Sequence, residues 1–585
     1  MVEQGAERRL TRGDYAILTA FCLVLFGYAC FSGRVLTMHE ARLPEASREM
    51  LAAGDWIIPR CGGRPWLERP PLPHWITMGV ASLFGRCDQV WIVRIPPVLM
   101  GLASVLLLAW MTARLLGRNL GMLSGLMLAT LFEFTRYAWM AEEEVFLAVA
   151  VIGMLAMFTK LEFDRDERPE SVSFFGNRPG MVWAFFLALG FSNQVKGLLF
   201  AAAMVVISVG GFLLWNADWR RMRRYIWLWG WLVFAASASI WLVLASLQYP
   251  DIMQVWFGDV TNRTDGSIGK DPIWYYWTAL LWALLPWTPC AIYGLWLTRN
   301  AALHRPRSAE RLIWCWAILP FAVLSLPTHK HHHYMVPCLA PWAVLAAIGA
   351  KQLWENVAAW PKWSKNPAWS VLGLGIPGAV ALIALGPYIP GPAGLPIVLA
   401  GAVPVALFVL SRGIACRDGR RATAMLFGLV AAGYLFAHSY SGMYIDTYRE
   451  DTRFLLESRQ IALEADAPVY VNAQGAALNP FRHLFYLGDR GRMLHNLTFL
   501  RDERILDSEV YVITQRRDEE KLRELGTPEV LAESQFHQRK QPADTRWTLF
   551  RVKFREDLDR HPADVHFTAM QVMEREPGPF LGKRL

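Results

Sequence analysis

Three consecutive carboxylates, Glu142 to Glu144, are the first feature of this sequence that could carry chemistry. They stand directly before an apolar segment long enough to cross a bilayer. Carboxylates beside hydrocarbon are costly, so they usually face a water-filled cavity and serve a function. A solvated helix N-terminus, where the helix dipole favours negative charge, is the alternative. We favour a functional role for at least one of the three and leave the choice among them open.

Side chains that could bind an anion recur farther along the chain. Arg263 precedes a Pro-x-Trp-Tyr-Tyr run, and a guanidinium group matches the oxygens of a phosphate. Lys196 interrupts an apolar run and either serves the same purpose or extends along a membrane interface. Lys330 and Tyr334 lie in the segment 328–337, which also contains four histidines.

The histidines of that segment also raise the question of a metal site, because imidazole is a common ligand. Ligands must converge in space, and adjacent histidines cannot all point the same way. A site would therefore need help from the first external loop, and its candidate ligands are Glu68, His74, His331 and His333. A divalent metal is an open alternative, and the function that we favour requires no cofactor.

The first element that must position these groups is a polar segment, residues 38–75, which follows the first apolar stretch. Residues 39–53 carry apolar side chains three or four apart with charged side chains between them, which predicts an amphipathic helix along a membrane surface. Gly54 is expected to end this helix. The glycines at 62 and 63 then turn the chain, and four prolines between 65 and 73 predict an extended return.

The order of residues in this segment resembles one family of enzymes. His-Glu-Ala-Arg-x-Pro-Glu-x-x-Arg-Glu-Met-Leu-x-x-Gly-Asp-Trp, followed by Trp-Leu-Glu-Arg-Pro-Pro-Leu-Pro-His-Trp, is similar to the first external loop of a superfamily of membrane glycosyltransferases. These enzymes have the GT-C fold and use polyprenyl-phosphate sugars; they include protein O-mannosyltransferases and the lipid A aminoarabinose transferases. Two positions depart from the family pattern. His39 stands in place of an aspartate, and Arg69 in place of a lysine, which keeps the charge but changes the hydrogen-bond geometry.

The resemblance implies an inverting glycosyltransferase that moves a sugar from a polyprenyl phosphate to a lipid or protein acceptor, outside the cytoplasmic membrane of a bacterium. Glu40 is then expected to be the general base, with His39 as the alternative. Glu142 or Glu143 would hold or orient the acceptor. The leaving phosphate would be stabilised by Arg69, Arg263, Lys330, Tyr334 and Lys196.

Composition independently places the chain in a membrane. Apolar residues make up 54% of the 585 positions. About thirteen apolar segments of spanning length recur between residues 15 and 443, among them 120–139, 370–388 and 394–411. Basic residues at the amino terminus and near 221, 305 and 420 would lie on the cytoplasmic side, which puts the N-terminus inside and the loop 34–91 outside. The net charge of +9 is then explained by the basic loops on the cytoplasmic side and does not indicate nucleic-acid binding.

The sequence becomes polar past residue 444, so we expect a membrane domain of residues 1–444 and an external α/β domain of residues 445–585. Strands are predicted at 468–471, 484–487, 510–513 and 547–552, with a helix at 518–525. The eight cysteines include no Cys-x-x-Cys pair. Cys61 and Cys87, at the two ends of the external loop, could form a disulfide.

Two rival functions stay open at this stage. A transporter or lipid flippase would also explain many spans and intramembrane charges, but it predicts inverted repeats, which we do not see in the sequence. A relative that has lost catalysis would explain the change from aspartate to His39.

Overall fold

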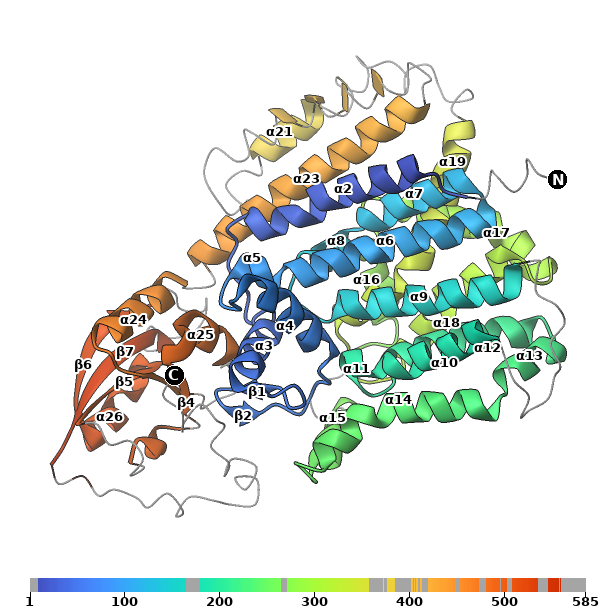
Figure 1. The fold of residues 1–585 in the computed structure, drawn as a ribbon. Helices are drawn as coiled ribbons and strands as arrows, with labels where there is room; N and C mark the ends of the chain where they lie inside the picture. Colours follow the sequence, from blue (N-terminus) through green and yellow to red (C-terminus); the bar gives the residue numbers. More distant parts are fainter. Residues whose placement is uncertain are drawn as a thin grey trace.

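The computed structural model is a bundle of long helices with a mixed β-sheet at one end (Figure 1). It describes residues 9–164, 179–264, 271–356, 376–384, 419–448, 452–472, 480–494, 496–501, 508–534 and 545–556, with a few isolated residues between 372 and 412 and at 558. Side chains at 259–264, 382 and 440–448 are outside this description.

The helices of the first half alternate between long apolar rods and short connectors. In chain order they are α2 (Arg12–Phe31), α3 (Arg42–Ala53), α4 (Leu72–Phe84), α5 (Val90–Val93), α6 (Ile95–Leu116), α7 (Arg118–Ala129), α8 (Phe132–Ala138), α9 (Glu144–Phe163), α10 (Gly180–Phe191), α11 (Asn193–Lys196), α12 (Phe200–Trp215), α13 (Trp219–Tyr225), α14 (Leu228–Ser246) and α15 (Ile252–Thr264). A two-stranded hairpin, β1 (Arg60–Cys61) and β2 (Arg64–Pro65), lies between α3 and α4.

The second half continues the bundle and then forms the sheet region. Its helices are α16 (Tyr275–Ala283), α17 (Thr288–His304), α18 (Ala309–Leu324), η1 (His332–Cys338), α19 (Ala340–Glu355), α21 (Ile376–Ala384), α23 (Gly419–Tyr448), α24 (Thr452–Glu464), α25 (Pro480–Leu487), η6 (Gly488–Arg490), η7 (Leu497–Arg501), η8 (Arg516–Asp518) and α26 (Glu519–Leu525). Its strands are β3 (Val469–Asn472), β4 (Gly491–Leu494), β5 (Glu509–Gln515), β6 (Gly526–Glu533) and β7 (Trp547–Phe554).

Several helices are suited to a membrane. Within the described residues, five are long and apolar enough to cross one: α2, α5 with α6, α9, α14 and the first part of α23. Two bent pairs, α16 with α17 and η1 with α19, raise the number to seven if each pair crosses once. The apolar segments 370–388 and 394–411, which we counted as spans, lie largely outside the described residues.

One expected span, residues 120–139, is broken into α7 and α8. The break leaves backbone groups without helical partners, and other helices supply them: Phe132 N–H donates to Leu285 O at 2.9 Å, and Tyr434 donates from its hydroxyl to Thr130 O at 3.0 Å. The Thr130 hydroxyl also accepts from Trp287 Nε1 at 2.9 Å. A non-helical step inside an apolar bundle is stable only when its polar groups are satisfied in this way.

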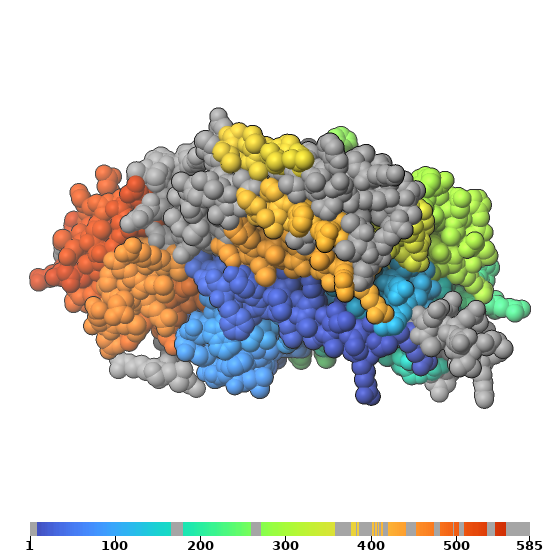
Figure 2. All heavy atoms as spheres, turned by 90° about the horizontal axis from the view of Figure 1, so that it is seen from above, coloured from blue at the N-terminus to red at the C-terminus, as the bar shows by residue number. Residues whose placement is uncertain are grey.

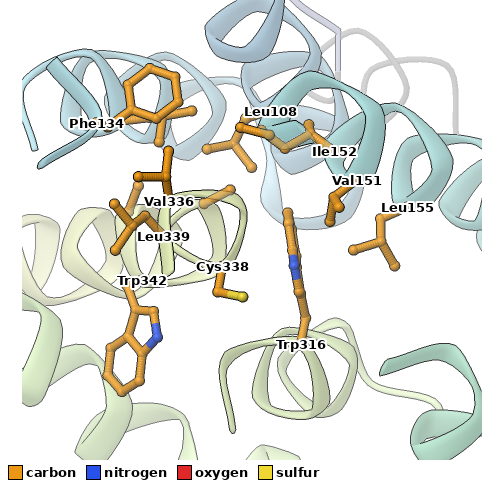
Figure 3. Packing of buried hydrophobic residues seen from close by; sticks show 14 of the residues in the cluster. Leu108, Phe134, Val151, Ile152, Leu155, Trp316, Val336, Cys338, Leu339 and Trp342 are labelled. Carbon is orange, nitrogen blue, oxygen red and sulfur yellow. The ribbon is translucent and has the colours of Figure 1, made fainter. Parts of the chain in front are cut away.

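The apolar core lies where α6, α8, α9, α18 and the η1–α19 corner meet, and Figure 3 shows part of it. Leu108 and Phe134 face Val336 and Leu339 across the bundle, with Trp316 close to the aliphatic side chains of α9. All of these side chains are buried. Close packing of this kind fixes where each helix ends, and therefore where the polar side chains at those ends lie.

The sheet has the strand order β4-β3-β5-β7-β6. β3 pairs in parallel with β4 and β5, whereas β7 pairs antiparallel with β5 and β6. The predicted strands at 468–471, 510–513 and 547–552 are confirmed. The prediction at 484–487 was wrong, because these residues end helix α25. A run of four apolar residues does not distinguish a strand from a buried helical turn, and Leu484 to Leu487 are all buried.

The first external segment packs between the helical bundle and the sheet region (Figure 1). Seen from above, the red and darker orange residues of the sheet region lie at one end of the molecule, while the lighter orange of α23 runs along the bundle beside the blue N-terminal residues (Figure 2). Tyr486 accepts the Leu36 N–H at its hydroxyl oxygen at 2.8 Å, and Arg482 Nε donates to Leu36 O at 3.0 Å. Arg48 of α3 pairs with Asp489 at 2.8 Å.

This packing corrects the prediction that α3 lies along a membrane surface. Its charged face is buried: Glu45 is 0%, Arg48 9% and Glu49 3% exposed. Arg48 pairs with Glu45 at 2.8 Å, and the Glu49 carboxylate accepts the backbone N–H groups of Gly62 and Gly63. The amphipathic pattern of α3 therefore arises because both of its faces pack against other parts of the protein.

The predicted end of α3 is confirmed, and the extended return is partly wrong. Gly54 adopts a φ of 67° and donates its N–H to Leu51 O, as a glycine that terminates a helix does. The prolines up to Pro70 lie outside helices, but Pro71 caps α4 and Pro73 lies in its first turn. Proline is favoured at the start of a helix because its fixed φ suits that position.

Candidate functional site

The three consecutive carboxylates lie where α8 ends and α9 begins. Glu144 is the first residue of α9 and is 3% exposed, whereas Glu142 and Glu143 are half-buried in the preceding turn. The alternative of a solvated helix terminus is therefore wrong for Glu144. Buried carboxylates need charged or hydrogen-bonding partners, and two of the three have a basic one.

Each of these two carboxylates has a basic partner from a different element. Arg69 of the first external segment places Nε 3.3 Å from Glu143 Oε2. Lys196, at the end of α11, forms an ion pair with Glu144. His333 of η1 places Nε2 3.7 Å from the same Glu144 oxygen. Three stretches of sequence more than 50 residues apart thus meet at one acidic turn.

The position of Lys196 depends on the glycine that follows it. Gly197 has a φ of 78°, and a β-carbon there would lie 3.0 Å from the Trp256 ring and 3.4 Å from Pro70. Trp256 in turn donates from Nε1 to Leu67 O at 2.9 Å. The first external segment and α15 therefore close around this turn. The Lys196 ammonium lies 4.7 Å from the ring centre of Tyr334, which brings the predicted tyrosine to the same place.

Glu142 differs from its two neighbours because it forms no ion pair with a basic side chain among the described residues. Its removal from water, together with the negative charges of Glu144 and Glu40, raises the pKa of this carboxyl to about 8. Burial also raises the pKa of Glu143, although Arg69 opposes that shift. A carboxyl group whose pKa lies near neutral can both accept and return a proton under working conditions.

Glu40 contradicts the expectation that it is the general base. Arg94 donates to it from Nε at 2.7 Å and from Nη2 at 3.1 Å, and Arg34 donates from Nη2 at 3.0 Å. The backbone N–H of Ala141 donates to it as well. Burial alone would raise the pKa of Glu40, but the two guanidinium groups outweigh it and lower the pKa to about 2. A fully enclosed carboxylate with so low a pKa holds the structure together and is a poor base.

His39 and Arg42 lie near the acidic turn, close enough for Glu144 to act on His39 and for Arg42 to act on Glu143. His39 is exposed on one side; partial removal from water and the charge of Arg42 lower its pKa, while Glu144 opposes the shift. A lowered pKa leaves the imidazole neutral near pH 7, which is the form that accepts a proton.

Arg42 is the functional candidate that we did not single out from the sequence. Among the described residues its side chain forms no hydrogen bond and no ion pair, yet its charge acts on both His39 and Glu143. Its place in the His-Glu-Ala-Arg motif was the available signal. A guanidinium group without a carboxylate partner beside an acidic site is suited to an anionic ligand.

Lys330 contradicts its predicted role. Its side chain is buried, and Nζ donates to Pro327 O at 2.6 Å and to Asp271 O at 3.2 Å. Its backbone N–H donates to Asp271 Oδ2 at 2.8 Å. The lysine therefore ties two loops together, and its ammonium group is engaged by their backbone carbonyls. Arg263 lies in α15, and its side chain is outside the described residues.

The expected metal ligands do not form a site. In the part of the chain that the structure describes, no three histidine, cysteine or acidic side chains are placed to hold an ion. Glu68 is exposed, whereas His74 is fully buried beside Trp66, and burial lowers the pKa of this histidine to about 3. His331 and His333 stack with ring centres 5.1 Å apart. The disulfide that we considered is also absent, because Cys61 and Cys87 carry free thiols.

Comparisons with known proteins show what this chain is similar to. Residues 68–243 match the family described as dolichyl-phosphate-mannose-protein mannosyltransferase. The chain is 29% identical over 340 residues to the undecaprenyl phosphate-alpha-4-amino-4-deoxy-L-arabinose arabinosyl transferase of Edwardsiella ictaluri, covering 56% of this chain and 58% of that protein. A protein with the same description from Erwinia tasmaniensis is 28% identical over 345 residues, covering 57% and 59%. The chain thus matches less than two thirds of the length of these relatives.

A solved structure shows the fold. ArnT from Cupriavidus metallidurans, in a crystal structure with bound undecaprenyl phosphate, matches with a TM-score of 0.71 and 21% identity, over 92% of this chain and 98% of that one. Its apo structure matches with a TM-score of 0.69. The chain therefore has the same mostly helical GT-C membrane fold, and its resemblance to glycosyltransferases that use polyprenyl-phosphate sugars is confirmed.

Proposed function

We propose that this protein transfers a sugar from a polyprenyl-phosphate donor to a lipid or protein acceptor at the outer face of the cytoplasmic membrane. The observation that carries the proposal is the acidic turn before α9, which meets Arg69, Lys196 and His333 from three other segments. The similarity of the chain to proteins named undecaprenyl phosphate arabinosyl transferases, and to a structure with bound undecaprenyl phosphate, supports a polyprenyl-phosphate donor.

The donor phosphate would bind among the basic groups on the open side of the site. Arg42 is the strongest candidate because it has no ion-pair partner among the described residues. Arg69, Lys196 and Tyr334 would contribute from the positions already given, with Arg263 of α15 as a further contact. Preorganised positive charge stabilises a leaving phosphate most where its negative charge develops.

The proton of a hydroxyl acceptor would pass to Glu142 or to His39. Glu142 offers a pKa of about 8, and His39 offers an imidazole whose pKa is lowered. Glu143, held by Arg69, would orient the acceptor. Attack on the anomeric carbon opposite the departing phosphate is a single displacement, which inverts that carbon.

The topology belongs to the same proposal. We place the N-terminus inside, residues 445–585 outside and about thirteen spans between them. The basic helix α13 then lies on the cytoplasmic side. Alkaline phosphatase fused to the C-terminus should be active, and the same reporter fused near Arg221 should be inactive. The reverse pattern would refute this topology and put the site on the other face.

Sugar transfer by the purified full-length protein tests the function. The protein, reconstituted in lipid nanodiscs, would receive undecaprenyl phosphates carrying radiolabelled sugars, with cell-envelope lipids or peptides as acceptors. Label should move to an acceptor with wild-type protein and should stay on the donor with the double variant Glu142→Gln, Glu143→Gln, which lacks both acidic groups facing the acceptor. Movement of intact donor across a vesicle membrane without transfer would favour the flippase. No transfer and no movement with any sugar would favour a relative without catalysis.

A further inference from the structure

A buried carboxylate of α8 holds one histidine of the segment 329–333 in a fixed orientation. Glu133 is 0% exposed, and its Oε1 lies 2.6 Å from Nδ1 of His332. An ionised carboxylate can only accept a hydrogen bond, so Nδ1 of this ring carries a hydrogen and donates it. The contact joins the start of η1 to a helix 199 residues earlier in the sequence.

The second nitrogen of the same ring is open to a ligand. The His332 side chain is 32% exposed, and among the described residues Glu133 is its one polar side-chain partner. Its other contacts are with rings, whose centres lie 5.6 Å away for Trp282, 5.7 Å for His333 and 6.4 Å for Tyr137. These rings shape the space beside the imidazole without occupying Nε2.

This imidazole borders the candidate site and takes no part in its ion pairs. His333, the next residue, lies 3.7 Å from Glu144. Lys196 and Arg69 are already paired with carboxylates. Arg136, the other cation near this histidine, lies 3.6 Å from Glu133 Oε2 and stacks over Tyr137. An anion entering the site from this side would therefore meet Nε2 of His332, which donates a hydrogen bond when the ring is protonated.

We propose that His332, positioned by Glu133, binds the phosphate of the lipid donor through Nε2. The inference rests on the proposed function and adds a residue to it. Binding through Nε2 uses the imidazolium form of the ring, which donates hydrogen from both nitrogens. Glu133 acts through the histidine and is a positioning residue, because it is enclosed and cannot reach a ligand.

Two amide substitutions separate this role from a merely structural one. In His332→Asn the amide nitrogen takes the place of Nδ1, so the bond to Glu133 is retained and the group at Nε2 is lost. In His332→Gln the amide nitrogen takes the place of Nε2, so a donor to the phosphate is retained and the bond to Glu133 is lost. If His332 serves only to anchor η1 to α8, His332→Asn should be tolerated better than His332→Gln. If it binds phosphate, His332→Gln should be tolerated better.

The probe is undecaprenyl phosphate, titrated against the full-length protein in nanodiscs. A hydrogen bond to a charged group corresponds to about a 10- to 100-fold change in affinity. We expect His332→Asn to weaken binding by about that factor, and His332→Gln and Glu133→Gln to weaken it less. His329→Asn, a neighbouring histidine outside this pair, should bind as wild type does. Undecaprenol, which lacks the phosphate, should not distinguish the variants.

The outcomes are distinguishable from a failure of the proposed function. If wild-type protein transfers sugar while His332→Asn retains wild-type affinity and donor KM, the inference about His332 is overturned and the function stands. If wild-type protein neither transfers sugar nor binds undecaprenyl phosphate, both fall. Should His332→Asn not fold, as judged by size exclusion and thermal unfolding, the Glu133→Gln variant decides: unchanged affinity there contradicts the proposal.

Discussion

Arg94 donates from Nε to Glu40 Oε1 at 2.7 Å, and these two side chains, 54 residues apart in the sequence, are both buried. The pair joins the first external segment to the start of α6. A second guanidinium group, that of Arg34, completes it. Glu40 therefore holds the residues around the site in place, and its loss should lower the free energy of unfolding.

Glu40→Gln should lower the free energy of unfolding by about 3–5 kcal/mol, because it leaves two buried guanidinium groups without their counter-charge. Thermal or denaturant unfolding of the purified protein measures this. Asp251→Asn, at an exposed position, is the control and should change stability by less than about 0.5 kcal/mol. An equally small effect of Glu40→Gln would contradict the structural role.

The same carboxylate predicts a dependence of stability on pH. Folding lowers its pKa from 4.5 to about 2. A group with a depressed folded-state pKa stabilises the protein above its unfolded pKa and loses that effect as the pH falls through the folded value. The contribution, about 3 kcal/mol, should be complete above pH 4.5 and decline toward pH 2. Glu40→Gln should flatten this part of the stability curve.

The pH profile of sugar transfer distinguishes the two candidate bases. A base works when deprotonated, so kcat/KM should rise with pH up to the pKa of the free group. If Glu142 is the base, the rise should continue to about pH 8, and Glu142→Gln should cost about 10²–10⁴-fold. If His39 is the base, the rise should end below pH 6.5, and His39→Asp should move it lower. A rate independent of pH from 5 to 9 would exclude both.

Arg42→Ala should weaken use of the lipid donor without destabilising the protein. The guanidinium group has no ion pair to lose within the described residues, and a charged hydrogen bond is worth about 1.5–3 kcal/mol, or about 10- to 100-fold in donor KM. Arg86→Ala, which removes an exposed guanidinium group paired with Asp88, is the control and should transfer normally. An unchanged donor KM for Arg42→Ala would remove this residue from the site.

Substitution of two adjacent glycines tests how the first external segment packs on the sheet region. Both have positive φ, 62° at Gly62 and 80° at Gly63, so alanine at either should cost about 1–3 kcal/mol of backbone strain. Gly62 has in addition no room for a β-carbon, which would lie 2.4 Å from Cβ of Met493 in β4.

Gly62→Ala should therefore destabilise the protein more than Gly63→Ala, whose added methyl group meets nothing within 4 Å. It should also expose residues near β4 to limited proteolysis, which reports separation of the two parts. Equal unfolding free energies for the two variants would mean that the contact with Met493 gives way without cost.

Local patterns in the sequence were sufficient for the features that depend on neighbours in the chain. Apolar runs gave most of the long helices, and Gly54 gave the end of α3. The acidic turn at Glu142 to Glu144 was recognisable because carboxylates beside hydrocarbon are energetically costly and usually serve a function. The motif order of the first external segment gave the family resemblance. Each of these inferences used residues within about one helix length of one another.

Only the tertiary structure decided which polar groups remain available for chemistry. Glu40 and Lys330 are residue types that could act in the site. In the structure, however, Glu40 accepts hydrogen bonds from Arg94, and Lys330 donates to backbone carbonyl groups of other loops. Arg42 and His332 were not chosen from the sequence, because what matters is that a guanidinium group and an imidazole nitrogen lack partners. Pairing between groups 50 to 200 residues apart depends on how the helices pack, and no local spacing encodes it.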